Sequence, residues 1–252
     1  MIAQALVLLI CNLAGPGTAD QAAPIVAKFL RHFEQSGGWS AETLRGVYET
    51  EAAACAASYR RDAPKLIVAD LPTYLAQRRA WALRPLAHLG AANAQRYYLL
   101  VRAGGPRTVA ALAGQPIVSV LTDARFVARV VLGGKLRERE LALRPITRPL
   151  QGLRAVARGQ AAAALVDEAT YRYLGQLQLD ATLESLHASP ALPGLTLLLS
   201  GKDAGQALEG RVRKALPELC RGAGAELCKT FSVPAFVAAA PAALRRIEAT
   251  YR

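Results

Sequence analysis

The chain has 252 residues, of which 52% are hydrophobic and only 6% aromatic. This composition excludes an intrinsically disordered chain, and it favours helices packed on a parallel sheet over an aromatic-rich β-sandwich. The formal net charge is +12, which favours anionic ligands or anionic surfaces as partners. The basic residues are scattered, however, with no five-residue basic run and no interleaved aromatic residues, so we predict no nucleic-acid interface.

The first apolar run, 5–11, is interpreted as a core strand rather than as a signal peptide. No Lys or Arg precedes it, and a polar turn follows at once. We therefore expect an export signal to be absent from this chain. A helix is predicted over 19–35 with Thr18 as its N-cap. Gly17 and Thr18 lie where backbone N–H groups at a helix start can hold an anion. No apolar run reaches the length of a transmembrane helix.

Short apolar runs and helical segments alternate along the rest of the chain. Further strands are predicted at 44–50, 65–69, 81–89, 96–101, 115–121, 141–146, 161–166, 183–187 and 195–199. Further helices are predicted at 51–61, 71–79, 109–113, 123–132, 149–158, 203–219 and 238–251. Thr108 and Thr122 are the predicted N-caps of the helices that follow them. This alternation is typical of an α/β protein with two mostly parallel sheets flanked by helices.

The stretch 152–173 is the clearest α/β unit in the sequence. Its run 161–166 is continuously apolar, as expected of a strand buried on both faces, and Asp167 follows directly. Asp70 repeats this arrangement after an earlier strand, and Tyr74 lies in the helix that comes next. Open α/β sheets bind ligands beyond the carboxyl ends of their strands, which makes these residues candidate contacts. Capping of the next helix explains the same carboxylates equally well.

Two breaks rich in Gly and Pro, near 98–106 and 189–196, isolate the middle third of the chain. They predict a discontinuous first lobe, 1–98 and 196–252, and a second lobe, 99–195. The chain would then cross between the lobes twice. Ligands commonly bind in clefts between such lobes and drive hinge closure.

The four cysteines form no C-x-x-C pair, and the three histidines are far apart, so we predict no metal site and no cofactor. Cys220 and Cys228 bracket a short loop that a disulfide would close in an oxidising compartment. A pair of buried thiols is the alternative. Cys11 lies in an apolar run and is interpreted as an ordinary core residue.

Four segments carry a family resemblance: YYLLVR at 97–102, TVAALAG at 108–114, RGQAAAALVD at 158–167 and SPALPG at 189–194. In this order they resemble the phosphate/phosphite/phosphonate-type periplasmic substrate-binding proteins of ABC transporters. The resemblance implies the two-lobed type 2 periplasmic-binding fold, a periplasmic or extracytoplasmic location and a transporter permease as partner. It also implies a monomer that meets the membrane only through the permease. The chain departs from the family at Asp123, in a turn that binds the anion, and at Ala162, where the family has Asp.

The resulting hypothesis is a non-enzymatic receptor for a small anionic ligand, phosphate-like or phosphonate-like. Its candidate contacts are Gly17, Thr18, Asp70, Tyr74, Thr122, Asp123 and Asp167. One alternative is an effector-binding or sensory domain of the same fold. Another is an enzyme that uses Asp70 and Asp167 as a carboxylate pair across the cleft. The sequence has no G-x-S-x-G, H-E-x-x-H or P-loop motif, which disfavours the enzyme.

Overall fold

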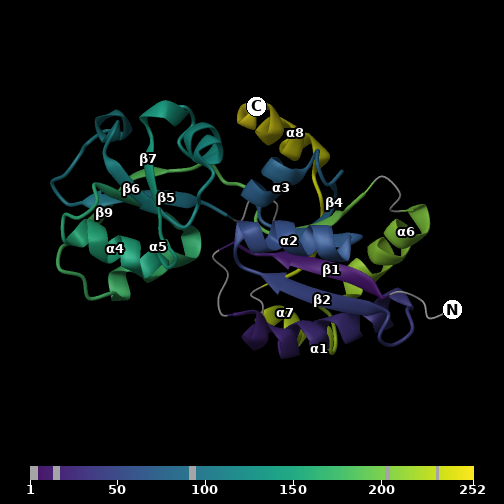
Figure 1. Cartoon of the computed structure of the whole chain (residues 1–252). Coiled ribbons are helices and arrows are strands. Elements are labelled where there is room, and N and C mark those ends of the chain that lie inside the picture. Colours follow the sequence, from purple (N-terminus) through teal and green to yellow (C-terminus); the bar gives the residue numbers. More distant parts are fainter. Residues whose placement is uncertain (1–4, 14–17, 91–94, 202–204, 231–232) are drawn as a thin grey trace. The chain divides into compact units, whose positions relative to one another are not determined.

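The computed structural model describes residues 5–13, 18–90, 95–201, 205–230 and 233–252 (Figure 1). The strands are β1 (Leu6–Cys11), β2 (Leu44–Glu49), β3 (Leu66–Ala69), β4 (Arg84–Leu89), β5 (Tyr97–Arg102), β6 (Pro116–Ser119), β7 (Ala142–Pro145), β8 (Ala163–Asp167), β9 (Leu183–Ala188), β10 (Thr196–Leu199) and β11 (Phe236–Ala238). The α-helices are α1 (Ala19–Gly37), α2 (Ala52–Asp62), α3 (Leu71–Gln77), α4 (Pro149–Ala157), α5 (Glu168–Tyr173), α6 (Gln206–Ala215), α7 (Gly224–Thr230) and α8 (Pro241–Tyr251). Short 3₁₀-helices form η1 (Val109–Leu112), η3 (Glu138–Glu140), η4 (Leu174–Gln176) and η5 (Leu216–Glu218). A π-helix forms η2 (Phe126–Val131).

The chain divides into two compact units. Unit 1 comprises Met1–Ala94 and Pro193–Pro241, and unit 2 comprises Gln95–Leu192 and Ala242–Arg252. This division differs from the predicted lobes at the C-terminus, because most of α8 belongs to unit 2 and not to unit 1. The hydroxyl of Tyr251 donates to Asp123 Oδ2 across 2.7 Å, which holds the end of α8 to unit 2. The chain therefore passes from one unit to the other three times, rather than the predicted two.

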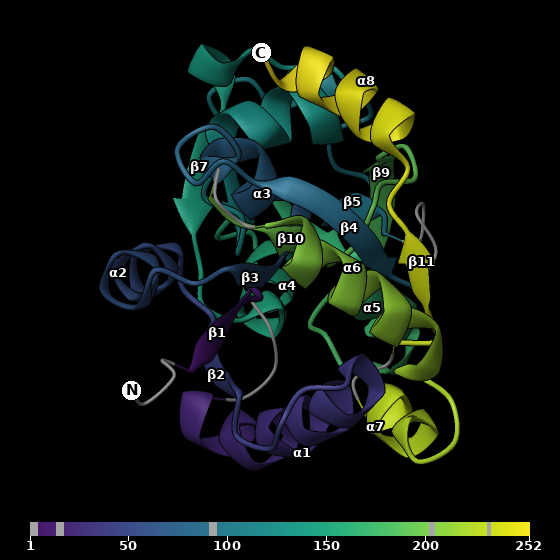
Figure 2. The same cartoon turned by 90° about the vertical axis from the view of Figure 1, so that its right-hand side faces the viewer.

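Unit 1 is built on a six-stranded sheet in the order β11-β4-β10-β3-β1-β2. Strands β1, β2 and β3 pair in parallel, whereas β10 runs antiparallel to both β3 and β4. Figures 1 and 2 both show α1 and α7 together on one face of this sheet, and Figure 1 shows α2 on the other. The apolar runs of β1 and β3 have no alternation because both faces of these strands are covered.

Helix α1 supplies the main cover of this sheet. Its residues Val26, Leu30 and Phe33 recur at helical spacing and are all buried against strand residues such as Leu8 and Leu197. The helix ends at Gly38, whose backbone has the left-handed conformation with φ of 68° that glycine adopts most readily. The amphipathic pattern of the sequence therefore fixes which face of α1 closes the core of unit 1.

Unit 2 is built on a five-stranded sheet in the order β7-β6-β8-β5-β9. Strands β6, β7 and β8 pair in parallel, and β5 runs antiparallel to β8 and β9. The predicted α/β unit at 152–173 is present as α4, β8 and α5. Leu153 and Val156 of α4 are buried against Ala164 of β8, as their spacing predicts. Both sheets are thus mostly parallel and flanked by helices, which confirms the predicted fold class.

Helix α4 lies unusually close to the second sheet at Gly152. A Cβ atom there would lie 2.7 Å from Ile146 Cδ1 and 3.2 Å from Val118 Cγ2. Gly152→Ala is therefore expected to lower the free energy of unfolding by about 1 kcal/mol through overpacking. Gly210 in α6 has no neighbour within 4 Å of such an atom, so Gly210→Ala is expected to raise it by about 1 kcal/mol through helix propensity. Urea denaturation of both variants checks this, and shifts of the same sign would contradict the close approach at Gly152.

Two disulfides are present, and the structure describes no free cysteine. Cys220 is bonded to Cys228, whose Cα atoms are 5.4 Å apart. The interpretation of Cys11 as an ordinary core residue was incomplete, because Cys11 is bonded to Cys55 of α2. The two Cα atoms are 5.8 Å apart although 44 positions separate them in sequence. The parallel pairing of β1 and β2, with α2 directly after β2, brings these residues together.

Two elements near the C-terminus were not predicted. Residues 221–227 were predicted to form the loop inside the disulfide, but α7 begins within this segment at Gly224. Strand β11 adds an edge strand beside β4. The predicted helix 203–219 is α6 followed by the tighter turn η5, where Pro217 removes a backbone donor. The predicted strand 115–121 ends already at Ser119, whose hydroxyl accepts from the backbone N–H of Leu121 across 2.9 Å.

Candidate ligand-binding site

The parallel strands of unit 1 end along one edge of its sheet. Cys11, the last residue of β1, is level with Glu49 of β2 and with Ala69 of β3. The backbone N–H of Asp70 donates to the carbonyl oxygen of Cys11 across 3.3 Å. The segment that leaves β1 and the start of α3 therefore lie side by side. This is the edge at which open α/β sheets bind ligands.

Asp70 ties these two segments together. Its Oδ1 accepts from the backbone N–H of Thr73 across 2.9 Å, and its Oδ2 accepts from the backbone N–H of Leu13 across 3.2 Å. Burial raises the pKa of Asp70 to about 6, and these hydrogen bonds to the ionised form oppose the shift. Asp70 thus caps α3 and also anchors the chain beyond β1. Tyr74, the next predicted contact, is only 4% exposed and belongs to the core of unit 1.

Thr18 caps α1, as predicted. Its Oγ1 accepts from the backbone N–H of Gln21 across 3.3 Å, and its own backbone N–H donates to Gln21 Oε1 across 3.0 Å. This reciprocal pair is a capping box. The Thr18 side chain is exposed, and its cap is uncharged. Gly17, the other candidate in this turn, lies outside the described residues.

In unit 2 the cap after β6 is Asp123 and not Thr122, which corrects the prediction. Asp123 Oδ1 accepts from the backbone N–H of Phe126 across 3.0 Å, while its Oδ2 accepts from the hydroxyl of Tyr251. The chain runs past the end of the strand before the helix begins, so the capping position falls one residue later. Thr122 is left exposed at the turn.

Asp167 also acts as a helix cap, because its Oδ1 accepts from the backbone N–H of Thr170 across 2.8 Å. Asp70, Asp123 and Asp167 thus each place a carboxylate at a helix start. A carboxylate in that position satisfies the N–H groups and the helix dipole that would otherwise attract an anion. Among the four junctions singled out from the sequence, only the one before α1 has an uncharged cap. An anion is therefore favoured at α1 over the other three.

Two residues that contact these strand-to-helix junctions were not predicted from the sequence. Tyr251 reaches Asp123 from 128 positions away, and the guanidinium of Arg125 lies 5.7 Å from the centre of the Tyr251 ring. No local pattern signals this contact. Asn12 directly follows β1 and hydrogen-bonds Tyr48. Burial raises the pKa of Tyr48 above its ordinary value, and the hydrogen bond from Asn12 only partly opposes this shift. Asn12 occupies the same strand-end position as Asp70. The rule that ligand contacts follow the carboxyl ends of strands, here called the junction rule, could therefore have identified it.

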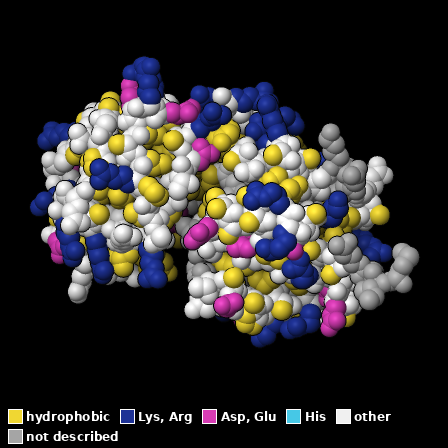
Figure 3. Space-filling view, viewed as in Figure 1, with side chains coloured by type: hydrophobic (Ala, Val, Ile, Leu, Met, Phe, Trp, Pro, Cys, Tyr) yellow, Lys and Arg dark blue, Asp and Glu magenta, His cyan; other side chains and the backbone are white. Residues whose placement is uncertain are grey.

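The described residues show neither a metal centre nor a membrane span. No group of three His, Cys, Asp or Glu side chains among them is arranged to hold a metal ion. None of the helices in the described part of the chain is long and apolar enough to cross a membrane. On the face shown in Figure 3, Lys and Arg side chains are spread over the surface rather than gathered in one patch.

No protein-family model and no curated protein matches the chain. Solved structures do match it over nearly its whole length. XAC2383 from Xanthomonas citri, bound to chloride, is similar with a TM-score of 0.75 and 12% identity over 98% of this chain and 97% of that one. PhnD1 from Prochlorococcus marinus, in complex with methylphosphonate, is similar with a TM-score of 0.70 and 11% identity over 97% and 96%. The periplasmic VFT2 domain of BvgS from Bordetella pertussis has a TM-score of 0.54 and 17% identity over 90% and 92%.

The chain has the type 2 periplasmic-binding fold. This fold accounts for the two mixed sheets and for the antiparallel strands β5 and β10, which lie directly after crossings between the units. The resemblance of segments such as 97–102 and 158–167 to phosphonate-type binding proteins is confirmed at the level of the fold.

Proposed function

We propose that the protein is an extracytoplasmic solute-binding protein that captures a small anion, phosphate-like or phosphonate-like, and delivers it to an ABC transporter permease. The observation that carries this proposal is the match of the type 2 periplasmic-binding fold over 97% of the chain to a protein solved with methylphosphonate. The net charge of +12 supports an anionic ligand, since it raises the local concentration of anions. The protein acts as a monomer, and its partner at the membrane is the permease.

The two disulfides support the extracytoplasmic location. Disulfides form and persist in oxidising compartments such as the periplasm, whereas cytosolic thiols are kept reduced. Both pairs join residues within unit 1 and include the buried Cys11, Cys55 and Cys228. A protein that needed these bonds for stability would be poorly suited to the cytoplasm.

In unit 1 the proposed anion contacts are the backbone at Gly17 and Thr18. In unit 2, taken by itself, the proposed contact is the hydroxyl of Thr122. Thr18 contributes the one uncharged cap among the four junctions, and Thr122 is an exposed hydroxyl that the helix after β6 does not use as its cap. Asp70, Asp123 and Asp167 hold the surrounding backbone, and their remaining lone pairs accept from hydroxyl or ammonium groups of a ligand. Tyr74 supports this edge from the core.

Methylphosphonate or phosphate at 100 times its dissociation constant is expected to stabilise the protein by about 2.7 kcal/mol, which a thermal-shift measurement detects. Thr122→Ala is expected to weaken binding about tenfold, because a hydrogen bond to a charged ligand is lost. The same variant should change stability by less than about 0.5 kcal/mol, since Thr122 is exposed and caps no helix. Calorimetric titration of both proteins gives the affinities.

Thr18→Ala has a matched control in Thr108→Ala. Both threonines are exposed N-caps whose Oγ1 accepts from a backbone N–H three residues later across 3.3 Å. Each variant is expected to lose about 1 kcal/mol of stability, and only Thr18→Ala is expected to lose affinity for the anion. No thermal shift with phosphate, phosphite or any alkylphosphonate would contradict the proposed ligand class.

A sensory role is the second candidate, and the likeness to the BvgS periplasmic domain is the observation that favours it. The ligand is the same in both roles. In transport the bound ligand is passed to a permease, whereas in sensing ligand binding is signalled to another protein or domain. Co-purification of the full chain with a permease would support transport. Ligand-dependent activity of a membrane-spanning kinase to which the chain has been fused would support sensing. Catalysis is disfavoured, since the carboxylates of Asp70 and Asp167 are each engaged as the cap of a helix.

A further inference from the structure

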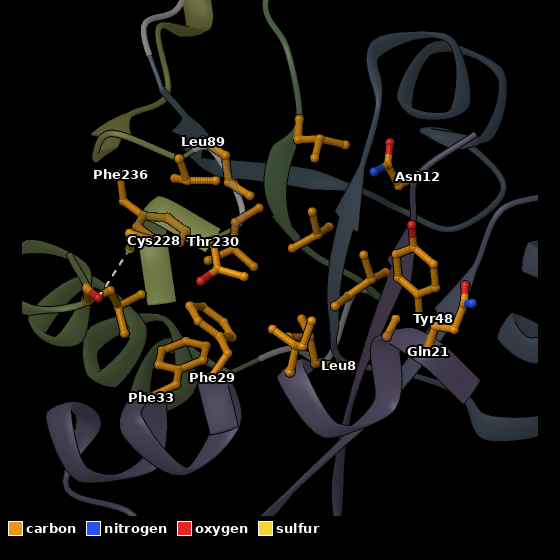
Figure 4. Close-up of a pocket in the computed structure, with 18 residues that line it drawn as sticks. Leu8, Asn12, Gln21, Phe29, Phe33, Tyr48, Leu89, Cys228, Thr230 and Phe236 are labelled. Carbon is orange, nitrogen blue, oxygen red and sulfur yellow. Dashed lines mark hydrogen bonds between the residues drawn. The ribbon is translucent and has the colours of Figure 1, made fainter. Parts of the chain in front are cut away.

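Unit 1 contains an apolar cavity that the proposed function does not use. The described residues of this unit surround a space of about 400 Å³ between the first sheet and the layer formed by α1 and α7 (Figure 4). Ile10 of β1 and Val68 of β3 form part of its floor, and Phe29 of α1 lies opposite. Protein interiors are normally packed without such spaces, and this volume lies within the range of small-molecule pockets.

The side chains around the cavity are large and only partly covered by the protein. The partly exposed lining residues are Ile25 and Phe29 from α1 and Leu89, Leu195 and Phe236 from the opposite layer. All of them except Ile25 also pack against the buried core of unit 1. The rings of Phe29 and Phe236 stack with their centres 6.1 Å apart and form one wall. No charged residue is among the described lining residues, so the cavity suits an uncharged hydrocarbon group.

One end of the cavity is polar. Asn12, Gln21 and Tyr48 lie together there, and the opposite end is lined by Leu89 and Phe236 (Figure 4). Asn12 follows β1 and Gln21 belongs to the first turn of α1, so this end opens at the carboxyl edge of the sheet. Amide and phenol groups can hydrogen-bond a polar head group. The rest of the lining is apolar except for Thr230, whose hydroxyl donates to the carbonyl oxygen of Glu226 across 2.9 Å.

We propose that unit 1 binds a single-chain amphiphile of medium length, with its alkyl chain in this cavity and its polar head at Asn12 and Gln21. The elongated apolar lining with hydrogen-bonding groups at one end matches a molecule of that shape. Burial of each methylene tightens binding by about fourfold until the chain exceeds the cavity. The polar head would lie next to the proposed anion contact Thr18, because Gln21 accepts from the backbone N–H of Thr18. The alkyl chain would lie among cavity residues that are not proposed anion contacts.

Hexanoate, octanoate, decanoate and tetradecanoate are titrated calorimetrically into the full oxidised chain. Affinity is expected to rise through decanoate and then to fall or level off. Ala22→Phe fills the cavity from α1 and is expected to weaken decanoate binding at least about tenfold. Ala53→Phe places the same ring on an exposed position of α2, outside the cavity, and is expected to leave the affinity unchanged.

Phe29→Ala provides a second variant that enlarges the cavity, and it is expected to shift the preferred chain length upward. The absence of binding by every chain, or equal binding by Ala22→Phe and the unmodified protein, would overturn the proposal. The proposal would also be overturned if affinity rose with chain length equally in the unmodified protein and in Ala22→Phe. That result would indicate adsorption of the alkyl chains to the protein surface. Methylphosphonate titrated in parallel keeps the two proposals separate. Thr122→Ala is expected to weaken methylphosphonate binding without changing the preferred chain length, whereas Phe29→Ala is expected to change the preferred chain length without weakening methylphosphonate binding.

Discussion

Replacing Cys11 and Cys55 together by alanine is expected to lower the free energy of unfolding by about 4 kcal/mol. A disulfide that closes a long loop restricts the unfolded chain more than a short one does, and this bond spans 44 positions. Both cysteines are buried, at 0% and 1% exposure, and they join β1 to α2 at the carboxyl edge of the sheet. Removal of this disulfide is therefore expected to destabilise the part of unit 1 that carries Thr18 and Asp70.

The second disulfide offers a matched control within the same unit. Cys220 and Cys228 are separated by only 8 positions, so their replacement by alanine is expected to cost about 2.5 kcal/mol. Urea denaturation of the two double variants and of the oxidised protein gives the three free energies. If the short-loop variant lost as much stability as the long-loop variant, restriction of the unfolded chain would not be the main effect.

Raising the pH from 4 to 7 is expected to destabilise the wild type by about 2.5 kcal/mol relative to Asp70→Asn. The pKa of Asp70 is raised by burial from 3.8 to about 6, so the folded protein holds a proton that the unfolded chain has released over this range. Stability from this carboxyl is therefore fully present below pH 3.8 and is lost as the pH rises through 6. The side-chain amide of the variant does not titrate, and its oxygen can still accept one of the two backbone hydrogen bonds.

Urea denaturation at pH 4, 5, 6 and 7 for both proteins gives the difference curve, in which all other titrating groups cancel. The curve should bend near pH 6 and become flat above it. A difference that grows in favour of the wild type with rising pH would mean that the hydrogen bonds from Leu13 and Thr73 outweigh burial at this site.

The fold was largely predictable because its strands are continuous apolar runs and its helices carry clear caps. Thr18, Thr108 and Gly159 mark helix ends at the positions where the structure has them. The elements that were missed are α7 and β11, with seven and three residues. Elements this short are stabilised by tertiary contacts rather than by a pattern of their own. The same reason applies to the Cys11–Cys55 bond, which depends on the pairing of β1 with β2.

The candidate site was only partly predictable. The junction rule located Asp70 and Asp167 correctly at strand ends, and it correctly named capping as the alternative role. It could not tell that all three carboxylates would cap, because a cap depends on where the helix begins to within one residue. At Thr122 and Asp123 that single residue decided the outcome. The contact between Asp123 and Tyr251 depends on the third passage of the chain, which no local pattern reveals.

That third passage also sets the order in which the protein can be completed during synthesis. Unit 1 needs residues up to Pro241, so it must wait while the whole of 95–192 emerges. Unit 2 receives its last helix only with Ala242–Arg252. Neither unit can therefore finish folding before these C-terminal residues have left the ribosome. Until they have emerged, the chain stays incompletely folded in both units.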